Sequence, residues 1–469
     1  MRPKFTLRPE PTALTADQMR VGRRQAIIYS CLSIVFWLAV NERVIALFVL
    51  RLDPLASNTV LAFFFALTPL AAILTALMSP VVDVVGKKRI IVPFYWCSTV
   101  LLALMILIPW TRSICSAAGA VRITAILLGV YAALRALGFP GWFPIVDDNV
   151  PDETRGQFFG TLRTQWQTVL IVATALGGLF LGNTPELWRF QVLVVVAVVA
   201  SILGNLALMA IPEAPVRQTV SREPFIQRLA VPFRNRVFAN FLIFGVLFSF
   251  AAACVGPITI RCLKSTLGVG DGFVVWMDTL AAIGAALTLR FWGNFVDRFG
   301  ARALFSILLP PLALVNLLWL LVARDRASWS ALLVIYFIVQ GVLTAGIGVG
   351  ITDMMLGSAG ESCRSAYINI AFVCNTVAAG VAPFAGAKIL HIFAGSQFSA
   401  GPLILDATRL VFLARAAFML LPLLLLNRLS RRHGGHVGQA LQQISGQALA
   451  RLPIDWRPAD KGGKDDRGR

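Results

Sequence analysis

The chain has 469 residues, of which 57% are hydrophobic and 14% are charged. Soluble domains are roughly 45–50% apolar and about 25% charged, so a soluble protein of this length could not bury so much apolar surface, and we expect a membrane protein. The formal charge of +19 would suit a nucleic-acid-binding protein, but the basic residues are scattered between long apolar runs. That distribution is typical of membrane topology, so we expect no nucleic-acid partner.

Residues 1–24 carry prolines and charges without an apolar run, and we expect them to form a cytoplasmic N-terminal segment. The first apolar run is too long for a secretory signal, so it should remain as a spanning helix.

Twelve apolar stretches follow, each close to the roughly 20 residues that cross about 30 Å of hydrocarbon. They run over 26–50, 58–80, 90–109, 121–146, 158–182 and 188–211 in the first half, and over 238–261, 273–296, 303–323, 329–355, 366–392 and 407–427 in the second. The sequence therefore predicts an all-α membrane protein with twelve transmembrane helices in two six-helix bundles, residues 25–212 and 238–428.

The remaining segments are polar and basic. Residues 213–237 form a central cytoplasmic loop in which apolar and basic residues interleave, which suits a segment on the membrane surface, and residues 429–469 form a basic tail whose role stays open. Six basic residues precede position 25 and nine follow position 427. Both termini are therefore expected in the cytoplasm, with the protein in a plasma membrane or a bacterial inner membrane.

The seven cysteines show no metal-binding spacing. Cys115 and Cys262 are both expected near the outer face, and whether they form a disulfide stays open. His433 and His436 are a weak metal signal in a solvated tail, so no metal and no cofactor is expected.

A short basic loop occurs twice, once in each half. The first copy runs over 79–88 and contains Asp83, and the second runs over 293–302 and contains Asp297, 214 positions later (297 minus 83). A second match pairs Arg155, before the fifth stretch, with Arg364, before the eleventh, 209 positions later (364 minus 155). Two loops in register across about 210 positions indicate two homologous, pseudo-symmetric bundles.

At these loops the chain resembles the major facilitator superfamily, in which the loop after spans 2 and 8 reads Gly-x-x-x-Asp-Arg-x-Gly-Arg-Arg/Lys. The second copy matches this pattern at Gly293, Asp297, Arg298, Gly300 and Arg302. The first copy matches at Asp83, Gly86, Lys87 and Lys88 but has Ser79 for the opening glycine and Val84 for the arginine. The resemblance implies a twelve-span transporter that works by alternating access.

These loops have an expected gating role. Asp83 and Asp297 can interact with the positive end of a facing helix, and the neighbouring basic residues can pair with acids such as Asp147 and Asp148. Such contacts would hold the two halves closed on the cytoplasmic side. For Lys87 and Lys88 the alternative is a topology signal that anchors the chain to anionic membrane lipid.

Of the charged residues inside the apolar stretches, nine are candidates for pairing or for facing water, since each otherwise costs about 2.5–3.5 kcal/mol at mid-bilayer. They are Glu42, Arg43, Arg135, Arg163, Asp278, Arg290, Asp353, Lys388 and Arg415. Four lie near span ends, where snorkelling or structural pairing is the expectation: Arg163, Arg290, Asp353 and Lys388.

Arg135 lies near the middle of the fourth stretch, so snorkelling from there is difficult, and it is the sharpest candidate for a substrate or coupling residue. A structural ion pair is the alternative. The superfamily often carries Arg-x-x-Gln-Gly in this span, and the chain has Arg135 without the glutamine, with Gly138 one place early.

Glu42 and Arg43 lie in the first stretch and, being adjacent, point about 100° apart on a helix. The resemblance implies that spans 1, 4, 7 and 10 line a central cavity, which Glu42 or Arg43 would then share with Arg135. Glu42 and Asp278 are candidates for proton coupling, because a buried carboxylate can carry a proton. The resemblance also places Arg415 at the periphery.

The sequence thus predicts a secondary transporter, not an enzyme, for a small organic solute that is anionic or amphipathic, with protons as a candidate coupling ion. Two alternatives stay open: a non-transporting membrane sensor or scaffold with the same fold, and a lipid or lysolipid transporter. Substrate identity, direction of transport and oligomeric state are left open as well.

Overall fold

The computed structural model describes residues 14–151, 154–214, 233–322, 329–358, 364–395, 398–400 and 403–429. The predicted segment 1–24 and the central loop are described in part. The tail beyond 429, including His433 and His436, lies outside the described residues.

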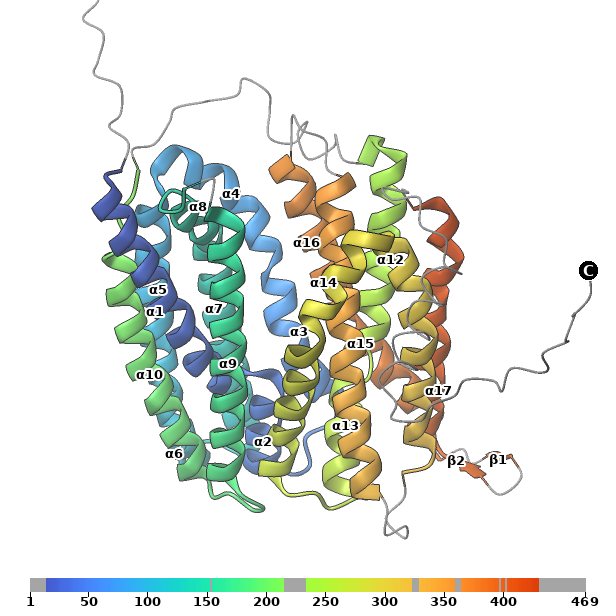
Figure 1. Cartoon of the computed structure of the whole chain (residues 1–469). Helices are drawn as coiled ribbons and strands as arrows, with labels where there is room; N and C mark the ends of the chain where they lie inside the picture. The colour runs from blue at the N-terminus through green and yellow to red at the C-terminus, as the bar shows by residue number, and fades with distance from the viewer. Residues whose placement is uncertain are drawn as a thin grey trace, which may run out of the picture.

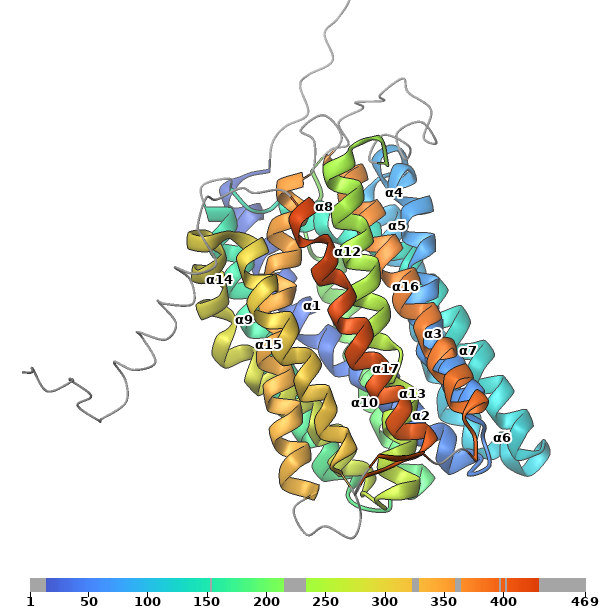
Figure 2. The same cartoon turned by 90° about the vertical axis from the view of Figure 1, so that its right-hand side faces the viewer.

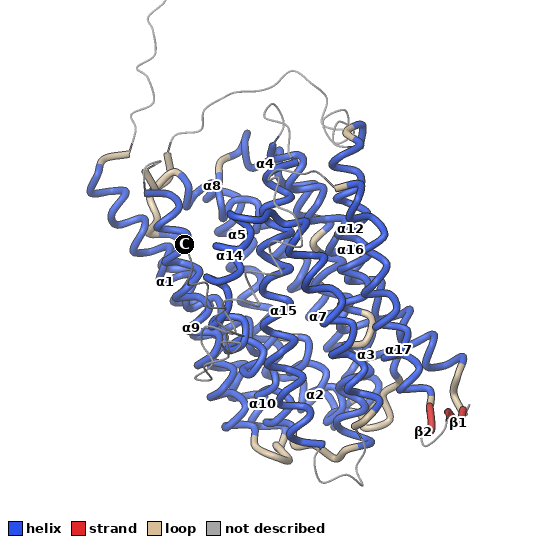
Figure 3. The backbone as a smooth tube through the Cα atoms, turned by 45° about the vertical axis from the view of Figure 1, so that its right-hand side comes forward, coloured by secondary structure: helices blue, strands red, loops and turns tan. Residues whose placement is uncertain are grey.

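The described chain is almost entirely helical (Figure 3). The first half consists of α1 (Ala16–Val40), α2 (Glu42–Leu52), α3 (Asn58–Ala71), α4 (Ile73–Val85), α5 (Lys87–Leu104), α6 (Ile108–Ile114), α7 (Ala117–Gly138), α8 (Trp142–Asp147), α9 (Arg155–Leu181) and α10 (Leu187–Met209), with short 3-10 turns at Met105–Leu107 and Phe139–Gly141.

The second half consists of α12 (Arg236–Ala253), α13 (Gly256–Arg261), a π-helical turn (Cys262–Thr266), α14 (Asp271–Asn316), α15 (Trp329–Ser358), α16 (Arg364–Ile392) and α17 (Ala407–Leu420), with 3-10 turns at Leu317–Leu320 and Leu421–Arg428. A small antiparallel hairpin, β1 (Phe398–Ala400) and β2 (Leu403–Leu405), connects α16 to α17.

Within the described residues, eleven helical segments are long and apolar enough to cross a membrane. One of them, Asp271–Leu320, has 50 residues, which at about 1.5 Å per residue is more than twice the thickness of a bilayer. Its backbone leaves the helical conformation at Gly300 (φ 79°, ψ 160°). Divided there, it supplies the predicted spans 8 and 9, so that the twelve-helix prediction holds and the chain is an integral membrane protein.

The two copies of the basic loop share this backbone geometry. Gly86 lies between α4 and α5 with φ 108° and ψ 149°, close to the values of Gly300. A side chain at such a positive φ would strain the backbone, which explains the glycine in both copies. The internal repeat read from the sequence is therefore also a repeat of local structure.

The helices form two groups that lie side by side (Figure 1). In the first, α1 packs against α9 and α10, and α5 against α7; in the second, α12 packs against α16 and α17, and α14 against α15. The groups meet along two helix pairs, α9 with α14 and α3 with α16, and the second pair runs side by side in Figure 2.

We call the end of the molecule where α1 begins and where α4 is followed by α5 the motif face, at the top of Figure 1, and the opposite end with the hairpin the distal face. One buried cluster joins residues of both halves toward the distal face, among them Phe48, Phe64, Val274 and Phe337. Toward the motif face two clusters are separate, one in each half. Packing therefore unites the halves at the distal face and leaves each with its own core at the motif face.

Candidate functional site

Two adjoining cavities, of about 300 and 350 Å³, are lined almost entirely by helices of the first half. They share five lining residues, so we treat them as one main cavity: Ser33, Tyr95, Arg135, Phe139 and Trp166. Further aromatic rings line it from α1, α7, α8 and α16, among them Trp37, Tyr131, Trp142 and Phe372. Such an aromatic lining with a few polar groups is typical of a small-molecule site.

Arg135 lies just past the middle of the segment Ala117–Asp147 and lines both parts of the main cavity. Its guanidinium carbon is 3.7 Å from the ring centroid of Tyr95 and 4.6 Å from that of Phe36. Its Nη2 donates a hydrogen bond to the hydroxyl of Tyr29 at 3.1 Å. Aromatic faces stabilise a cation through their quadrupole, which explains how the charge is tolerated here.

The hydrogen bonds of Arg135 are incomplete. Its Nη1 is buried and has no hydrogen-bond partner, and among the described residues Arg135 forms no ion pair with a carboxylate. The structural ion pair considered as its alternative role is therefore not formed in the described part of the chain. The guanidinium retains the capacity to bind an anion.

Arg163 also lines the main cavity, with its guanidinium carbon 4.8 Å from the ring centroid of Trp166. We expected snorkelling or structural pairing for it from its depth alone. No pattern in the sequence indicated that this face of α9 borders the cavity. Arg290 and Lys388, by contrast, are exposed near span ends, as expected.

The first span is broken, which the sequence did not predict. Asn41 ends α1 with an extended backbone (φ −58°, ψ 139°), and its side chain accepts a hydrogen bond from the backbone of Arg43 at 2.9 Å, which caps α2. An asparagine at this position satisfies an amide at the new helix start. The break lies beside the main cavity, since Glu42 lines it.

Arg43 and Glu42 face different surroundings, as their adjacency predicted. Arg43 forms an ion pair with Asp278 of α14, with Nη1 and Oδ1 2.7 Å apart and the two side chains 26% and 22% exposed. This pair joins the first half to the second. Glu42 lies on the wall between the main cavity and a smaller cavity. A coupling role for Glu42 or Asp278 stays a prediction.

The halves are in close contact at the distal face. The amide of Gly272 donates to the carbonyl of Gly182 at 2.6 Å, and that of Asp271 to the carbonyl of Asn183 at 3.1 Å. A Cβ at Gly272 would lie 2.2 Å from the carbonyl oxygen of Gly178, so only glycine permits this approach. Deeper between the halves, Thr279 donates to Thr174 at 2.8 Å between their Oγ1 atoms.

Asp271 is fully buried at this contact and was not singled out in the sequence. Its carboxylate pairs with Nε of Arg51 from the first half at 3.0 Å and with Lys264 of the second half. An acid at a helix start in a polar loop is an ordinary pattern. The glycines at 178, 270 and 272 were the sequence feature that could have indicated this contact between the halves, because small residues allow helices to approach closely.

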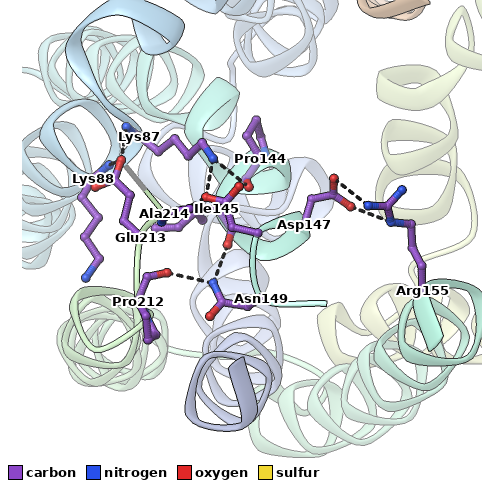
Figure 4. Close-up of polar contacts among 11 residues, drawn as sticks. Lys87, Lys88, Pro144, Ile145, Asp147, Asn149, Arg155, Pro212, Glu213 and Ala214 are labelled. Atoms are coloured by element: carbon purple, nitrogen blue, oxygen red, sulfur yellow. Dashed lines mark hydrogen bonds and ion pairs between the residues drawn. The ribbon is translucent and has the colours of Figure 1, made fainter. Parts of the chain in front are cut away.

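The basic loop at the motif face forms the predicted pairs with acids, but within one half (Figure 4). Nζ of Lys87 pairs with Asp148 and donates to the carbonyl of Pro144 at 3.3 Å. Arg155 pairs with Asp147, with Nε and Oδ1 2.9 Å apart. Because α5, α8 and α9 all belong to the first half, our expectation that these contacts bridge the halves is wrong for this conformation.

Glu213 adds a cap to the first loop. Its Oε1 accepts from the backbone amides of Lys87 at 2.6 Å and Lys88 at 3.3 Å, at the start of α5 (Figure 4). Nζ of Lys88 donates to the carbonyl of Met209 at 2.8 Å. These contacts fix the spans of the first half together at the motif face, and a role for them in gating stays a prediction.

The other predicted motif residues lie on α4, α14 and α16. Asp83 lies in the last turns of α4 and Arg364 begins α16, while their side chains lie outside the described part. Asp297 and Arg298 are exposed, and Arg302 donates to Oδ1 of Asn427. Gly293 has open space around it, so packing does not require a glycine there.

Cys115 and Cys262 are both free, so the disulfide left open is not formed.

Comparison with known proteins gives one family. Residues 245–454 match the sequence model described as Major Facilitator Superfamily. No curated protein matches the chain.

Solved structures match across most of the chain. A nucleoside transporter, NupG in a D323A mutant form, is 16% identical with a TM-score of 0.64, and the match covers 87% of this chain and 100% of that one. A D-xylose-proton symporter is 13% identical with a TM-score of 0.64, covering 88% and 97%. A bacterial homolog of a human lysosomal transporter, Spinster, is 13% identical with a TM-score of 0.61, covering 87% and 99%. At these identities the likeness shows the shared fold.

Proposed function

We propose that this chain, whose residues 245–454 match the Major Facilitator Superfamily model, is a secondary transporter that carries a small organic anion by alternating access. The observation that supports this proposal best is Arg135, a cation that lines both parts of the main cavity with a buried donor and no acidic partner among the described residues. A carboxylate or phosphate group of the solute supplies the missing acceptor, with the strength of a charge-assisted hydrogen bond.

The lining of the main cavity favours an anionic or amphipathic solute. Two arginines, Arg135 and Arg163, face it against one acid, Glu42. The aromatic rings around them offer apolar faces for the rest of the solute.

The conformation supports alternating access as the mechanism. The halves share one core and direct backbone contacts at the distal face, whereas their cores are separate at the motif face. With both termini in the cytoplasm, as the basic residues predict, the distal closure lies on the outer side. Protons are the proposed coupling ion, carried by Glu42 or by Asp278, whose pairing with Arg43 changes as the halves move.

The test is a solute screen on purified protein, with Arg135→Gln and its control Arg122→Gln, which removes an exposed arginine from the same helix. Anionic, neutral and cationic solutes are compared by the shift in thermal unfolding temperature, and every solute that binds is then tested for uptake into liposomes. One anionic class should stabilise the parent and the control by about 2 °C or more and lose this effect in Arg135→Gln.

The rival functions give different results. Binding that depends on Arg135 without any uptake would indicate a sensor or scaffold. Stabilisation by lipids or lysolipids alone would indicate lipid transport. Anion uptake that Arg135→Gln leaves unchanged would contradict the proposed site.

A further inference from the structure

A second, smaller cavity of about 210 Å³ lies between the halves on the distal side of the main cavity. Residues of both halves line it, with Glu42, Arg43 and Pro69 from the first and Tyr336, Gln340 and Arg415 from the second. We call it the distal cavity. Its volume is below that of usual sites for drug-sized ligands, which begin at about 300 Å³.

Arg415 is the unexpected member of this lining. The resemblance placed it at the periphery of the molecule, but the residue is 4% exposed and lies in α17 facing the interior. The sequence could not show this, because the depth of a residue in a helix does not tell which side the helix presents to its neighbours.

The guanidinium of Arg415 meets neutral groups. Its Nη1 donates to the hydroxyl of Tyr336 at 2.9 Å and its Nη2 to the carbonyl of Ala252 at 3.3 Å. Its Nε is buried without a hydrogen-bond partner, and no carboxylate forms an ion pair with it among the described residues. A buried charge is costly unless an opposite charge compensates it.

The other charges of the distal cavity do not supply that compensation. Arg43 is paired with Asp278, so this pair is neutral in sum. Glu42 lies on the wall shared with the main cavity and forms no hydrogen bond with Arg415. Tyr336 cannot serve as the counter-charge, because its hydroxyl accepts from Arg415 and donates to Oδ1 of Asn316 at 3.1 Å.

We propose that the distal cavity binds a small monovalent anion, of the size of chloride or nitrate, with Arg415 as its principal ligand. Gln340 and Thr259, which also line the distal cavity, offer further polar groups. This site is distinct from the proposed solute site at Arg135, and it touches both halves. An anion bound there compensates Arg415 and bridges the halves near their distal contact.

The test measures thermal unfolding of the full-length protein in detergent in sodium nitrate or sodium chloride against sodium gluconate at equal ionic strength. The small anions should raise the unfolding temperature of the parent by about 2 °C or more, an order of magnitude that follows from ligand linkage. Arg415→Gln should abolish this shift. Arg428→Gln, which removes an exposed arginine from the turn after α17, should keep it.

Two further variants keep the test decisive if Arg415→Gln does not fold. Ala379→Leu fills the distal cavity from α16 without removing a charge and should also abolish the shift. Glu42→Gln removes a negative charge from the cavity wall and should make the anion-dependent shift in unfolding temperature larger. No difference between nitrate and gluconate in the parent, or a shift that either Arg415→Gln or Ala379→Leu retains, would overturn the proposal.

Discussion

At the scale of single residues, the sequence identified Arg135 from its depth in the fourth span, and the structure places it in the main cavity. Its surroundings could not be predicted. Tyr29, which accepts its hydrogen bond, is 106 positions away in the chain, and Tyr95 belongs to another span. Which rings surround a buried cation depends on how the helices are rotated against one another, and their own sequences do not fix that rotation.

The hydrogen bond between Arg135 and Tyr29 orients the guanidinium for a solute. Tyr29→Phe should raise the KM for transport about tenfold or more with little change in kcat, because a hydrogen bond to a charged group is worth about 1.5 kcal/mol or more. Uptake kinetics in liposomes measure this. Tyr367→Phe, which removes the hydroxyl of a buried tyrosine in the second half, is the control. An unchanged KM in Tyr29→Phe would mean that the bond has no part in solute binding.

At the scale of elements, the sequence predicted every span but not the break in the first one. A single asparagine in an apolar run is weak evidence of a break, since its capping role appears only when the following amides are free. Gly86 and Gly300 were more informative, because the repeated loop pattern contains a glycine at the turn, and both adopt a positive φ. The 50-residue segment therefore divides where the motif predicted a loop.

The cap at Asn41 supports the cavity-facing turn of α2. Asn41→Ala should destabilise the protein by about 1 kcal/mol and reduce transport, because Glu42 and Arg43 follow directly. Ser57→Ala removes a comparable cap, that of α3 at the distal face. It should cost a similar stability and leave transport nearly unchanged. Thermal unfolding and uptake separate the two effects, and equal loss of transport in both variants would contradict a specific role for the break.

At the scale of the whole molecule, the sequence predicted two related bundles, whose domain limits stay a prediction, but not which face holds them together. A transporter of this fold passes through several conformations with one sequence, so the sequence cannot specify the one seen. The inter-half contacts also depend on residues that the sequence did not single out, Asp271 and Arg51, together with the close backbone approach at Gly272.

Asp271 should stabilise the closed distal face. Asp271→Asn removes the charge that pairs with Arg51 and Lys264, and opening at this face should become about tenfold more frequent, which corresponds to about 1.4 kcal/mol. A cysteine at position 279, where Thr279 is buried, reports this as faster labelling by a membrane-impermeant thiol reagent. Glu186→Gln, an exposed acid at the same face, is the control. Equal labelling rates would show that Asp271 does not hold this face closed.

The central claim, that the halves must separate at the distal face to move a solute, has a direct test. Thr174 and Thr279 lie in opposite halves with their Oγ1 atoms 2.8 Å apart, so cysteines at both positions in a cysteine-free background can form a disulfide with little rearrangement. Uptake into liposomes is measured after oxidation with a membrane-permeant oxidant and again after reduction. We predict that the cross-linked protein does not transport and that reduction restores transport. Full uptake by protein shown to be completely cross-linked would contradict alternating access through this interface.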